Sequence, residues 1–318
     1  MKILKSVLAV SCIGFLACGE DNPSSTLGNV AASNNTDQSG QEILSSDAME
    51  MSSSDESAVV LSSSSLAVKE SSSSFVVPGC KTETEDNCVY GTIIDSRDGK
   101  TYKTVVIGDQ EWMAENLQYD YPVDIGDSVV NYCNAGIHGR CSDVGVYYTW
   151  ADAVGADPAS NCNENKCELP EGDIQGICPD GWHLPSVDEF KTLFFAIGGN
   201  CGSVSYTSQH EPIQTCYNVS NKLKTTSGWK EMDSFDGDDR YGFSAIPSGR
   251  WASYGMRQNS FYAVYNTSTQ YNDRGAYTVW LYGGTTVGLA TGETTANIHT
   301  DFSKGDRYVV RCVKNVGI

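Results

Sequence analysis

Residues 178–190 read Cys178-Pro-Asp-Gly-Trp-His-Leu-Pro-Ser-Val-Asp-Glu-Phe190. Ser186 can accept hydrogen bonds from the first free amides of a helix while Glu189 reaches back to the Ser186 amide, the pattern of a capping box. Glycines at 198 and 199 can end the helix in the left-handed conformation. Apolar residues recur at helical spacing between these two signals: Phe190, Leu193, Phe194 and Ile197. The stretch therefore predicts one amphipathic helix over 187–197.

The cysteines indicate that this helix belongs to a fold closed by disulfide bonds. Cys178 precedes the helix and Cys312 lies in the last strand-like run, so a bond between them would join the start of the fold to its end. Of twelve cysteines, Cys12 and Cys18 fall in an N-terminal export signal, which leaves an even number for an oxidising compartment. Paired CxxC knuckles are missing, which favours disulfides over zinc thiolates. Proximity in sequence predicts the other pairs: Cys80 with Cys88, Cys133 with Cys141, Cys162 with Cys167 and Cys201 with Cys216.

Residues 1–18 have the form of an export signal. A short basic head, Met1–Lys5, precedes an apolar run, Ser6–Ala17, that is too short to span a bilayer as a finished helix. Its end resembles a bacterial lipoprotein processing site, which implies that Cys18 is lipidated and becomes the mature N-terminus. An ordinary cleaved signal with an incidental cysteine is the alternative. Gly19 after the cysteine favours the outer membrane as the destination.

Residues 19–79 are rich in serine and acidic residues and have almost no aromatic side chains. Such a segment cannot bury enough apolar area to offset its conformational entropy, so we expect a disordered tether. As a flexible coil of about 60 residues it would reach roughly 45 Å. The tether would hold a folded domain, residues 80–318, away from the membrane surface.

The charge of the chain limits its partners. The sequence contains 21 Lys and Arg against 40 Asp and Glu, a formal net charge of −19 at pH 7. Phosphate binding needs a cationic surface, so nucleic acids and anionic lipid surfaces are disfavoured as partners. Neutral ligands, cations and proteins remain, and the N-terminal lipid is the expected membrane contact.

The folded part predicts a single α+β domain. Asp98-Gly99 is a hairpin turn signal between two β-branched runs, which indicates that the domain starts with antiparallel strands. The strand-like runs are 89–95, 102–107, 111–117, 241–247, 260–265, 275–282 and 308–313. Short helices are expected at 147–153 and 219–224. We therefore expect irregular antiparallel strands, long loops, one main helix and several disulfides.

Short motifs along this part form an ordered set. They are Glu111-Trp-Met-Ala-Glu-Asn-Leu117, Tyr148-Thr-Trp150, Cys178-Pro-Asp-Gly-Trp-His-Leu-Pro185, Leu223-Lys224, Gly242-Phe-Ser-Ala-Ile-Pro-Ser-Gly249, Tyr277-Thr-Val-Trp280 and Val310-Arg-Cys-Val-Lys314. In that order they resemble the Fibrobacter succinogenes major paralogous domain over about residues 90–317. More distantly, Trp182-His-Leu-Pro185 and Arg311-Cys-Val313 resemble the C-type-lectin-like fold of formylglycine-generating-enzyme relatives. The resemblance implies that fold and a surface lipoprotein, and it implies no activity.

The sequence contains no visible catalytic constellation. The ten remaining cysteines pair off and the four histidines are scattered, so neither a reactive thiol nor a base beside one is evident. His183 lies at the start of the main helix, where we expect a structural role rather than general-base chemistry. No Ser-His-Asp or paired-carboxylate pattern is evident. We therefore expect a domain that is not an enzyme.

An acidic loop is the candidate metal site. Asp233-Ser-Phe-Asp-Gly-Asp-Asp239 places four carboxylates beside a glycine, and oxygen ligands on a flexible loop suit Ca²⁺. The candidate ligands are Asp236, Asp238 and Asp239. The spacing is not that of an EF-hand, and the sequence favours the alternative of a solvated acidic turn.

Aromatic and amide side chains gather between Trp251 and Tyr282, a mixture that suits a carbohydrate. Sugar rings stack on aromatic rings while their hydroxyls need polar partners. The candidate ligand-binding residues are Trp251, Tyr254 and Tyr271, which lie near glycines and polar residues. Their neighbours with core-like spacing are expected to be buried: Phe261, Val264, Tyr277 and Trp280.

These features predict a lipoprotein anchored in the outer membrane and exposed at the cell surface. Its domain would bind a ligand rather than transform one. A polysaccharide or other glycan is the leading ligand class, with a role in adhesion. A non-enzymatic protein-interaction or scaffold domain of the cell envelope is the alternative.

Overall fold

The structure is a computed structural model that describes residues 75–125, 128–131, 144–206, 212–229, 237–252, 255–257, 261–282, 295–300 and 303–316. The predicted signal, with Cys18, and the predicted tether up to residue 74 lie outside these residues. The helices are α2 (Trp150–Ala153), α3 (Val187–Ala196) and α4 (Ser220–Leu223), with a 3₁₀ turn at Pro158–Ser160. In the described part of the chain, no helix has both the length and the apolar character of a membrane span.

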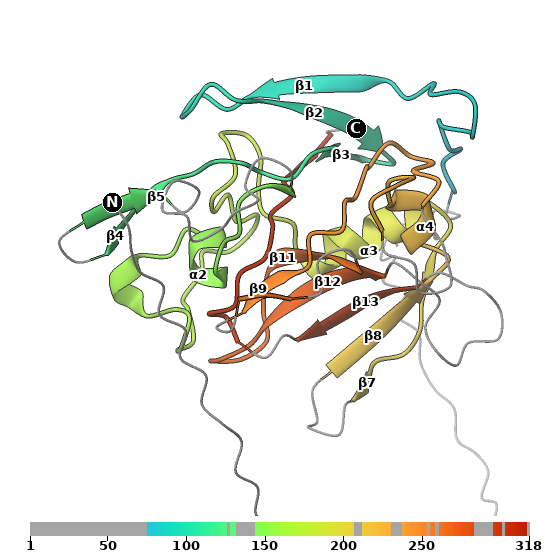
Figure 1. Cartoon of the computed structure of the whole chain (residues 1–318). Coiled ribbons are helices and arrows are strands. Elements are labelled where there is room, and N and C mark those ends of the chain that lie inside the picture. Colours follow the sequence, from blue (N-terminus) through green and yellow to red (C-terminus); the bar gives the residue numbers. More distant parts are fainter. Residues whose placement is uncertain are drawn as a thin grey trace, which may run out of the picture. The chain divides into compact units, whose positions relative to one another are not determined.

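The described residues form an α+β domain built on two antiparallel sheets (Figure 1). The strands are β1 (Tyr90–Ile94), β2 (Thr101–Ile107), β3 (Gln110–Met113), β4 (Pro122–Ile125), β5 (Ser128–Asn131), β6 (Asn200–Cys201), β7 (Ser205–Tyr206), β8 (Pro212–Tyr217), β9 (Arg250–Ala252), β10 (Gly255–Arg257), β11 (Tyr262–Gln270), β12 (Ala276–Tyr282), β13 (Thr295–Thr300) and β14 (Val313–Asn315). The smaller sheet has the order β1-β2-β3-β14. The larger has the order β11-β12-β13-β8-β6, and β7 also pairs with β8. The predicted fold class is confirmed.

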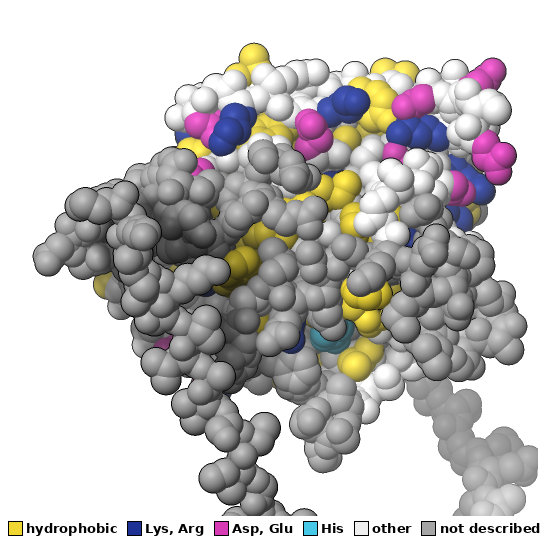
Figure 2. Space-filling model, viewed as in Figure 1, with side chains coloured by type: hydrophobic (Ala, Val, Ile, Leu, Met, Phe, Trp, Pro, Cys, Tyr) yellow, Lys and Arg dark blue, Asp and Glu magenta, His cyan; other side chains and the backbone are white. Residues whose placement is uncertain are grey.

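Charged side chains of both signs are interspersed over the four-stranded sheet (Figure 2). Lys314 on β14 lies 2.8 Å from the Glu111 carboxylate on the neighbouring strand β3. Lys100, just before β2, lies 3.0 Å from the Asp98 carboxylate in the hairpin turn. This face therefore presents paired charges rather than a field of one sign.

Helix α3 packs against both sheets and joins them into one core. Its capping box forms as predicted: Ser186 Oγ accepts from the Glu189 amide, and the Glu189 carboxylate accepts from the Ser186 amide at 2.8 Å. The Phe190 ring lies 5.0 Å from Trp112 of β3 and 6.0 Å from Tyr265 of β11, measured between ring centroids. Burying a side chain of this size contributes about 1.5–3 kcal/mol. The predicted main helix is therefore the centre of the core.

Residues 241–247, expected to be a strand, form a turn. Gly242 and Ser244 have φ angles of +69° and +55°, left-handed values that lie outside the β region. Instead of a ladder, the backbone forms an isolated bridge between Ala245 and Lys224. The apolar run is nevertheless in the core, since Phe243 is fully buried. The pattern therefore predicted burial correctly and the backbone conformation wrongly.

Residues 308–312 are a second departure, because they are extended but belong to no strand. The chain here runs between other elements, and its backbone carbonyls accept hydrogen bonds from them. The Leu117 amide donates to the Val310 carbonyl at 2.8 Å, and the Met113 amide donates to the Cys312 carbonyl at 3.0 Å. Only Val313–Asn315 forms a ladder, as β14. The sequence indicates an extended run but not the partner of each amide.

Arg311 connects the turn at residues 241–247 to the extended segment at residues 308–312. Its side chain is buried, and its guanidinium donates to Asn116 Oδ1 at 2.7 Å and to the carbonyls of Phe243 and Ser244. Burial lowers the pKa of Arg311, and the nearby phenol of Tyr265 opposes that shift. Since a buried charge that loses its partners is costly, these hydrogen bonds hold the turn against the C-terminal segment.

Four disulfides are present in the described residues, and each joins cysteines that the sequence analysis pairs. They are Cys80–Cys88, Cys162–Cys167, Cys178–Cys312 and Cys201–Cys216. The bond between Cys178 and Cys312 closes the longest separation, 134 residues. Cys133 and Cys141 lie outside the described residues.

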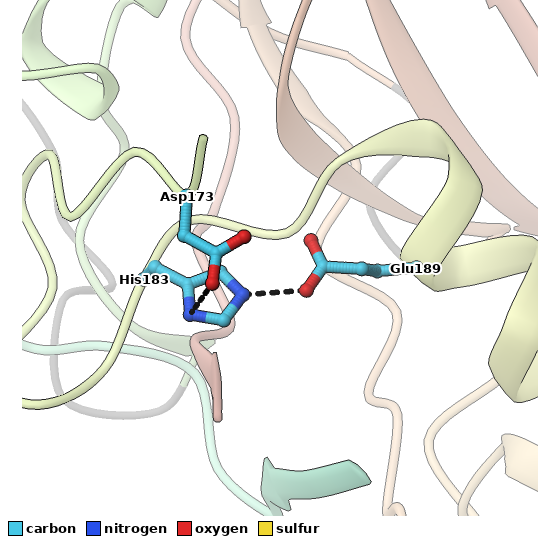
Figure 3. A group of neighbouring side chains, drawn as sticks. All are labelled: Asp173, His183 and Glu189. Carbon is cyan, nitrogen blue, oxygen red and sulfur yellow. Dashed lines mark hydrogen bonds and ion pairs between the residues drawn. The ribbon is translucent and has the colours of Figure 1, made fainter. Parts of the chain in front are cut away.

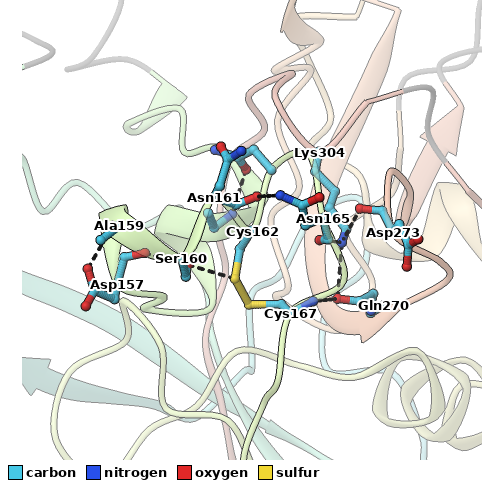
Figure 4. The surroundings of a disulfide bond; sticks show 12 residues. Asp157, Ala159, Ser160, Asn161, Cys162, Asn165, Cys167, Gln270, Asp273 and Lys304 are labelled. Carbon is cyan, nitrogen blue, oxygen red and sulfur yellow. Dashed lines mark hydrogen bonds between the residues drawn. A yellow bond between two sulfur atoms is a disulfide. The ribbon is translucent and has the colours of Figure 1, made fainter.

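A buried lysine fastens the loop of the Cys162–Cys167 disulfide to the β11–β12 turn (Figure 4). Lys304 Nζ donates to the carbonyl of Asn165 at 2.9 Å, to Gln270 Oε1 at 3.1 Å and to the carbonyl of Asp273 at 2.9 Å. These acceptors come from two stretches far apart in sequence, the disulfide loop and the β11–β12 turn. All three ammonium hydrogens therefore have a partner.

Candidate functional site

A cavity of about 220 Å³ lies where the first turns of α3 face the β7–β8 hairpin and the adjoining strands. Its apolar lining consists of Val187, Val204, Pro212 and Ile298. Its polar lining consists of Asp188, Lys191, Gln214, Thr269 and Tyr277. This cavity is called the Tyr277 pocket below. It combines apolar walls with a few polar groups, the composition of small-molecule sites.

Local hydrogen bonds position the walls of the Tyr277 pocket. The Val187 amide, at the first turn of α3, donates to Thr269 Oγ1 at the end of β11 at 3.0 Å. Gln214 Nε2 on β8 donates to the carbonyl of Gly202 at 2.8 Å, which leaves the amide oxygen of that side chain for other partners. The pocket is therefore built on a helix and strands that are fixed to each other.

Tyr277 lines the pocket, and two more tyrosines lie near it. Tyr277 is half-buried, and the Tyr271 ring stands nearly perpendicular to it at 5.7 Å between centroids. Tyr271 is 39% exposed and Tyr206 on β7 is 67% exposed. Burial raises the pKa of Tyr277, and the nearby phenols of Tyr271 and Tyr206 raise it further because two phenolates would repel. The Tyr277 hydroxyl has no hydrogen bond within the described residues and is free for a ligand.

An ion pair forms the polar rim. Lys191 Nζ lies 3.3 Å from Asp188 Oδ1, one turn apart on α3, and the Asp188 side chain is 90% exposed. Such exposed pairs contribute little to stability, so both groups can exchange partners at small cost. The rim therefore offers a donor and an acceptor beside an aromatic wall.

The structure places the three predicted ligand-binding residues differently. Tyr271 contacts Tyr277 and is exposed beside the pocket. Trp251 is half-buried, pairs through its backbone with Arg307 and is not part of the pocket lining. Tyr254 lies outside the described residues. Of the residues expected in the core, Val264 and Trp280 are buried, whereas Tyr277 lines the pocket.

Two of the three predicted calcium ligands have protein partners. The Asp239 carboxylate is buried and accepts from Lys81 Nζ at 2.6 Å and from Ser244 Oγ at 2.7 Å. Asp238 lies 2.6 Å from the Arg240 guanidinium. Asp236 lies outside the described residues. These partners take carboxylate oxygens that a calcium ion would need, so the calcium site stays a prediction without support from Asp238 and Asp239.

A second group of chemistry-bearing side chains lies on another side of the α3 start (Figure 3). His183 Nε2 lies 2.5 Å from Glu189 Oε1, and His183 Nδ1 lies 3.8 Å from Asp173 Oδ2. The histidine ring is buried, Glu189 is half-buried and Asp173 is exposed. Burial alone would lower the pKa of His183, but Glu189 and then Asp173 outweigh it, so the net pKa is raised. These three residues, called the His183 group below, carry ligand atoms within 4.8 Å of one another.

The comparison with family models shows which protein family the chain belongs to. The model of the Fibrobacter succinogenes major domain matches residues 105–314. The chain belongs to the Fibrobacter succinogenes major domain family. The family segment contains every residue that lines the Tyr277 pocket and all three residues of the His183 group.

No curated protein matches the chain. No solved structure matches it either, so the expected likeness to the C-type-lectin-like fold stays a prediction. Membership of the Fibrobacter succinogenes major domain family therefore fixes the relationship without assigning an activity to either site.

Sequence reasoning missed Tyr206, the position of Tyr277 and the His183 group. Tyr271 and Tyr277 flank an Asn-Asp-Arg-Gly turn, a signal that could have placed the two rings on one hairpin end. The convergence of Asp173, His183 and Glu189 had no comparable signal, because Asp173 reaches His183 only through the fold.

Proposed function

We propose that the domain binds a glycan in the Tyr277 pocket and does not transform it. One observation carries the proposal: the half-buried Tyr277 and the exposed Tyr271 stand beside a cavity with mixed apolar and polar walls. A sugar ring can stack its carbon face on an aromatic ring while its hydroxyls bond to nearby polar groups. The free Tyr277 hydroxyl, the Gln214 amide oxygen and the rim pair at Asp188 and Lys191 supply such groups.

The size of the pocket favours one sugar unit or the end of a chain. About 220 Å³ is below the roughly 300–1,000 Å³ of pockets that enclose a drug-sized ligand. The exposed rings of Tyr271 and Tyr206 would extend the contact along a polysaccharide. Further units of a chain would therefore lie outside the cavity.

The composition of the pocket supports binding over hydrolysis. Asp188 is the carboxylate among the lining residues, and glycoside hydrolysis in most families uses two carboxyl groups about 5–9.5 Å apart. Among the described lining residues, a bound sugar would meet one acid, at the rim. This supports a binding role.

Retention on insoluble glycans tests the proposal. We expect the purified chain to bind cellulose, xylan or a related polysaccharide, and Tyr271→Ala to weaken binding about tenfold, or about 1.4 kcal/mol. Phe195→Ala is the matched control, because Phe195 is an aromatic ring on α3, 44% exposed and outside the pocket lining. Equal losses for the two variants, or no retention on any glycan, would contradict the proposal.

The alternative is a protein-interaction domain, and the edge strand β1 favours it. Val89, just before β1, is 87% exposed and Ile94 is 66% exposed, and the strand has a hydrogen-bonded neighbour on one side, β2. Exposed edges of this kind can accept another strand. Retention of an envelope protein that is lost on Ile94→Lys, with glycan binding absent, would support this reading.

We propose that the chain is anchored in the outer membrane through a lipid on Cys18 and displayed at the cell surface. The basic head, the short apolar run and the small residue before Cys18 support this proposal. Metabolic labelling with a palmitate analogue should mark the chain, and Cys18→Ser should abolish the label and release the protein. Surface proteolysis of intact cells would test display. A labelled Cys18→Ser variant would contradict the anchor.

A further inference from the structure

The His183 ring lies between two carboxylates, and only one of the two contacts is a hydrogen bond. Nε2 lies 2.5 Å from Glu189 Oε1, within hydrogen-bonding distance, whereas Nδ1 and Asp173 Oδ2 are 3.8 Å apart (Figure 3). A neutral imidazole carries one N–H. If Glu189 takes that N–H, the lone pair of Nδ1 faces the oxygen of Asp173.

The separation of Nδ1 and the Asp173 oxygen suits two ligands of one metal ion. Zinc binds histidine nitrogen and carboxylate oxygen at about 2.0–2.2 Å, so two ligand atoms up to about 4.2 Å apart can reach the same ion. The observed 3.8 Å lies within that limit. One imidazole nitrogen with one carboxylate selects a transition metal, because calcium prefers ligand sets made of oxygen.

Glu189 holds the histidine in the orientation that a metal ligand requires. Metal-binding histidines almost always donate the other ring N–H to a carboxylate or carbonyl, which fixes the tautomer. The second oxygen of Glu189 accepts from the Ser186 amide at 2.8 Å and the Ser186 hydroxyl at 2.9 Å. The backbone of His183 is fixed by paired hydrogen bonds with Val313 at 2.9 and 3.0 Å. Helix cap and strand bridge together preorganise the ring.

We propose that Asp173 and His183 Nδ1 bind a divalent transition-metal ion, with Zn²⁺ the best match, and that Glu189 is a positioning residue. The Asp173 side chain is 60% exposed, so the ion would be reached from solvent. Water, or a donor from a bound partner, would complete its coordination. The site is distinct from the Tyr277 pocket, although Asp188 of the pocket rim precedes Glu189 on the same helical turn.

Calorimetric titration of the metal-stripped chain with Zn²⁺ tests the proposal, with Ca²⁺ as the comparison ion. We expect Zn²⁺ to bind and Asp173→Asn to weaken it at least tenfold. Asp188→Asn is the matched control, because it removes an exposed carboxylate next to Glu189 without touching the ligands. Absence of Zn²⁺ binding would overturn the proposal, as would equal affinities for the parent chain, Asp173→Asn and His183→Gln.

The role of Glu189 has its own readout. Glu189→Gln keeps a residue that can close the capping box, so the helix start should be retained. The loss of the carboxylate should weaken the metal roughly 10- to 100-fold. The visible absorption of bound Co²⁺ should shift, because the orientation of the imidazole changes. An unchanged Co²⁺ spectrum and affinity in a folded variant would remove Glu189 from the site.

Discussion

The buried contacts of Lys304, called the Lys304 tie, and the Tyr277 pocket use the same kinds of side chain: a lysine, a glutamine and an aromatic ring. In the tie these groups interact with one another, whereas in the pocket they keep hydrogen-bonding capacity free within the described residues. Lys304 Nζ has three oxygen partners and lies 4.6 Å from the centre of the Trp150 ring, and the lysine is 1% exposed. In the pocket, Lys191 has one exposed carboxylate partner. The Tyr277 hydroxyl has no hydrogen bond among the described residues.

The difference shows that the number of hydrogen-bond partners, rather than the residue type, decides whether a polar side chain stabilises the fold or can bind a ligand. A buried polar group with every hydrogen bond formed holds segments together, because breaking one bond leaves its neighbour unsatisfied. A group that faces a cavity with bonds left over is available to a ligand. Substitutions of fully hydrogen-bonded buried groups should therefore change the free energy of unfolding, and substitutions in the pocket should change ligand binding.

Removal of the long disulfide should have the largest effect. Replacing Cys178 and Cys312 by serine removes a constraint over 134 residues, and loop entropy predicts a loss of about 5 kcal/mol. The same change at Cys201 and Cys216, beside the pocket strands, removes a constraint over 15 residues and should cost about 3 kcal/mol. Urea denaturation measures both. Equal losses would show that strain or residual structure, rather than loop length, dominates.

Lys304→Met should be the next most damaging change. The substitution leaves three oxygens without their donor, and a loss of about 2–4 kcal/mol in unfolding free energy is expected. Lys191→Met, at the pocket rim, should change stability by less than about 0.5 kcal/mol because it removes an exposed ion pair. The comparison fails if the two lysines prove equally important in urea denaturation.

The buried interaction of the Asp95 carboxylate with Arg97 should make the stability of the fold pH-dependent. Burial alone would raise its pKa, but hydrogen bonds from Arg97 outweigh burial and hold the pKa below the ordinary 3.8. A folded-state pKa below the unfolded value stabilises the fold above pH 4, and this contribution is lost as the pH falls through the folded pKa. Asp95→Asn should cost about 1–2 kcal/mol at neutral pH and progressively less in acid.

Unfolding free energies measured across pH 2–7 check this expectation. Asp188→Asn serves as the control, since its exposed carboxylate has little to lose. A penalty for Asp95→Asn that stayed constant down to pH 2 would show that packing, rather than the charge, is the important contribution of Asp95.

Tyr271→Ala should have the smallest effect on stability. The ring is 39% exposed and contacts Tyr277 by one edge, so the unfolding free energy should change by about 0.5 kcal/mol or less. Thermal melting of the variant alongside its glycan retention separates the two roles. A marked drop in melting temperature would place Tyr271 among the structural residues instead.

Local chemistry explains which parts of the fold were predictable. The capping box at Ser186 and Glu189 and the Asp98-Gly99 turn lie within a few residues of their partners, so sequence alone is sufficient. Strands β8 and β13 were not predicted. They contain both polar and apolar side chains, and such a segment forms a strand only where neighbouring strands pair with its backbone on both sides.

The candidate sites were less predictable than the fold. Tyr271 was identified because glycines and polar residues surround it, whereas Tyr277 was assigned to the core from its spacing. A strand pattern shows which residues share a face, but not whether a helix covers the end of that face. In this fold Tyr277 is half-buried and lines a pocket together with residues of α3.

The sequence by itself determined the helix with its cap, the hairpin, the family and the four observed cysteine pairings. Only the tertiary structure decided that α3 packs against two sheets, that residues 308–312 thread between segments, and that Asp173 meets His183. The physical reason is range. Caps and turns depend on bonds between near neighbours, whereas a cavity or a ligand pair depends on segments that only the folded core brings together.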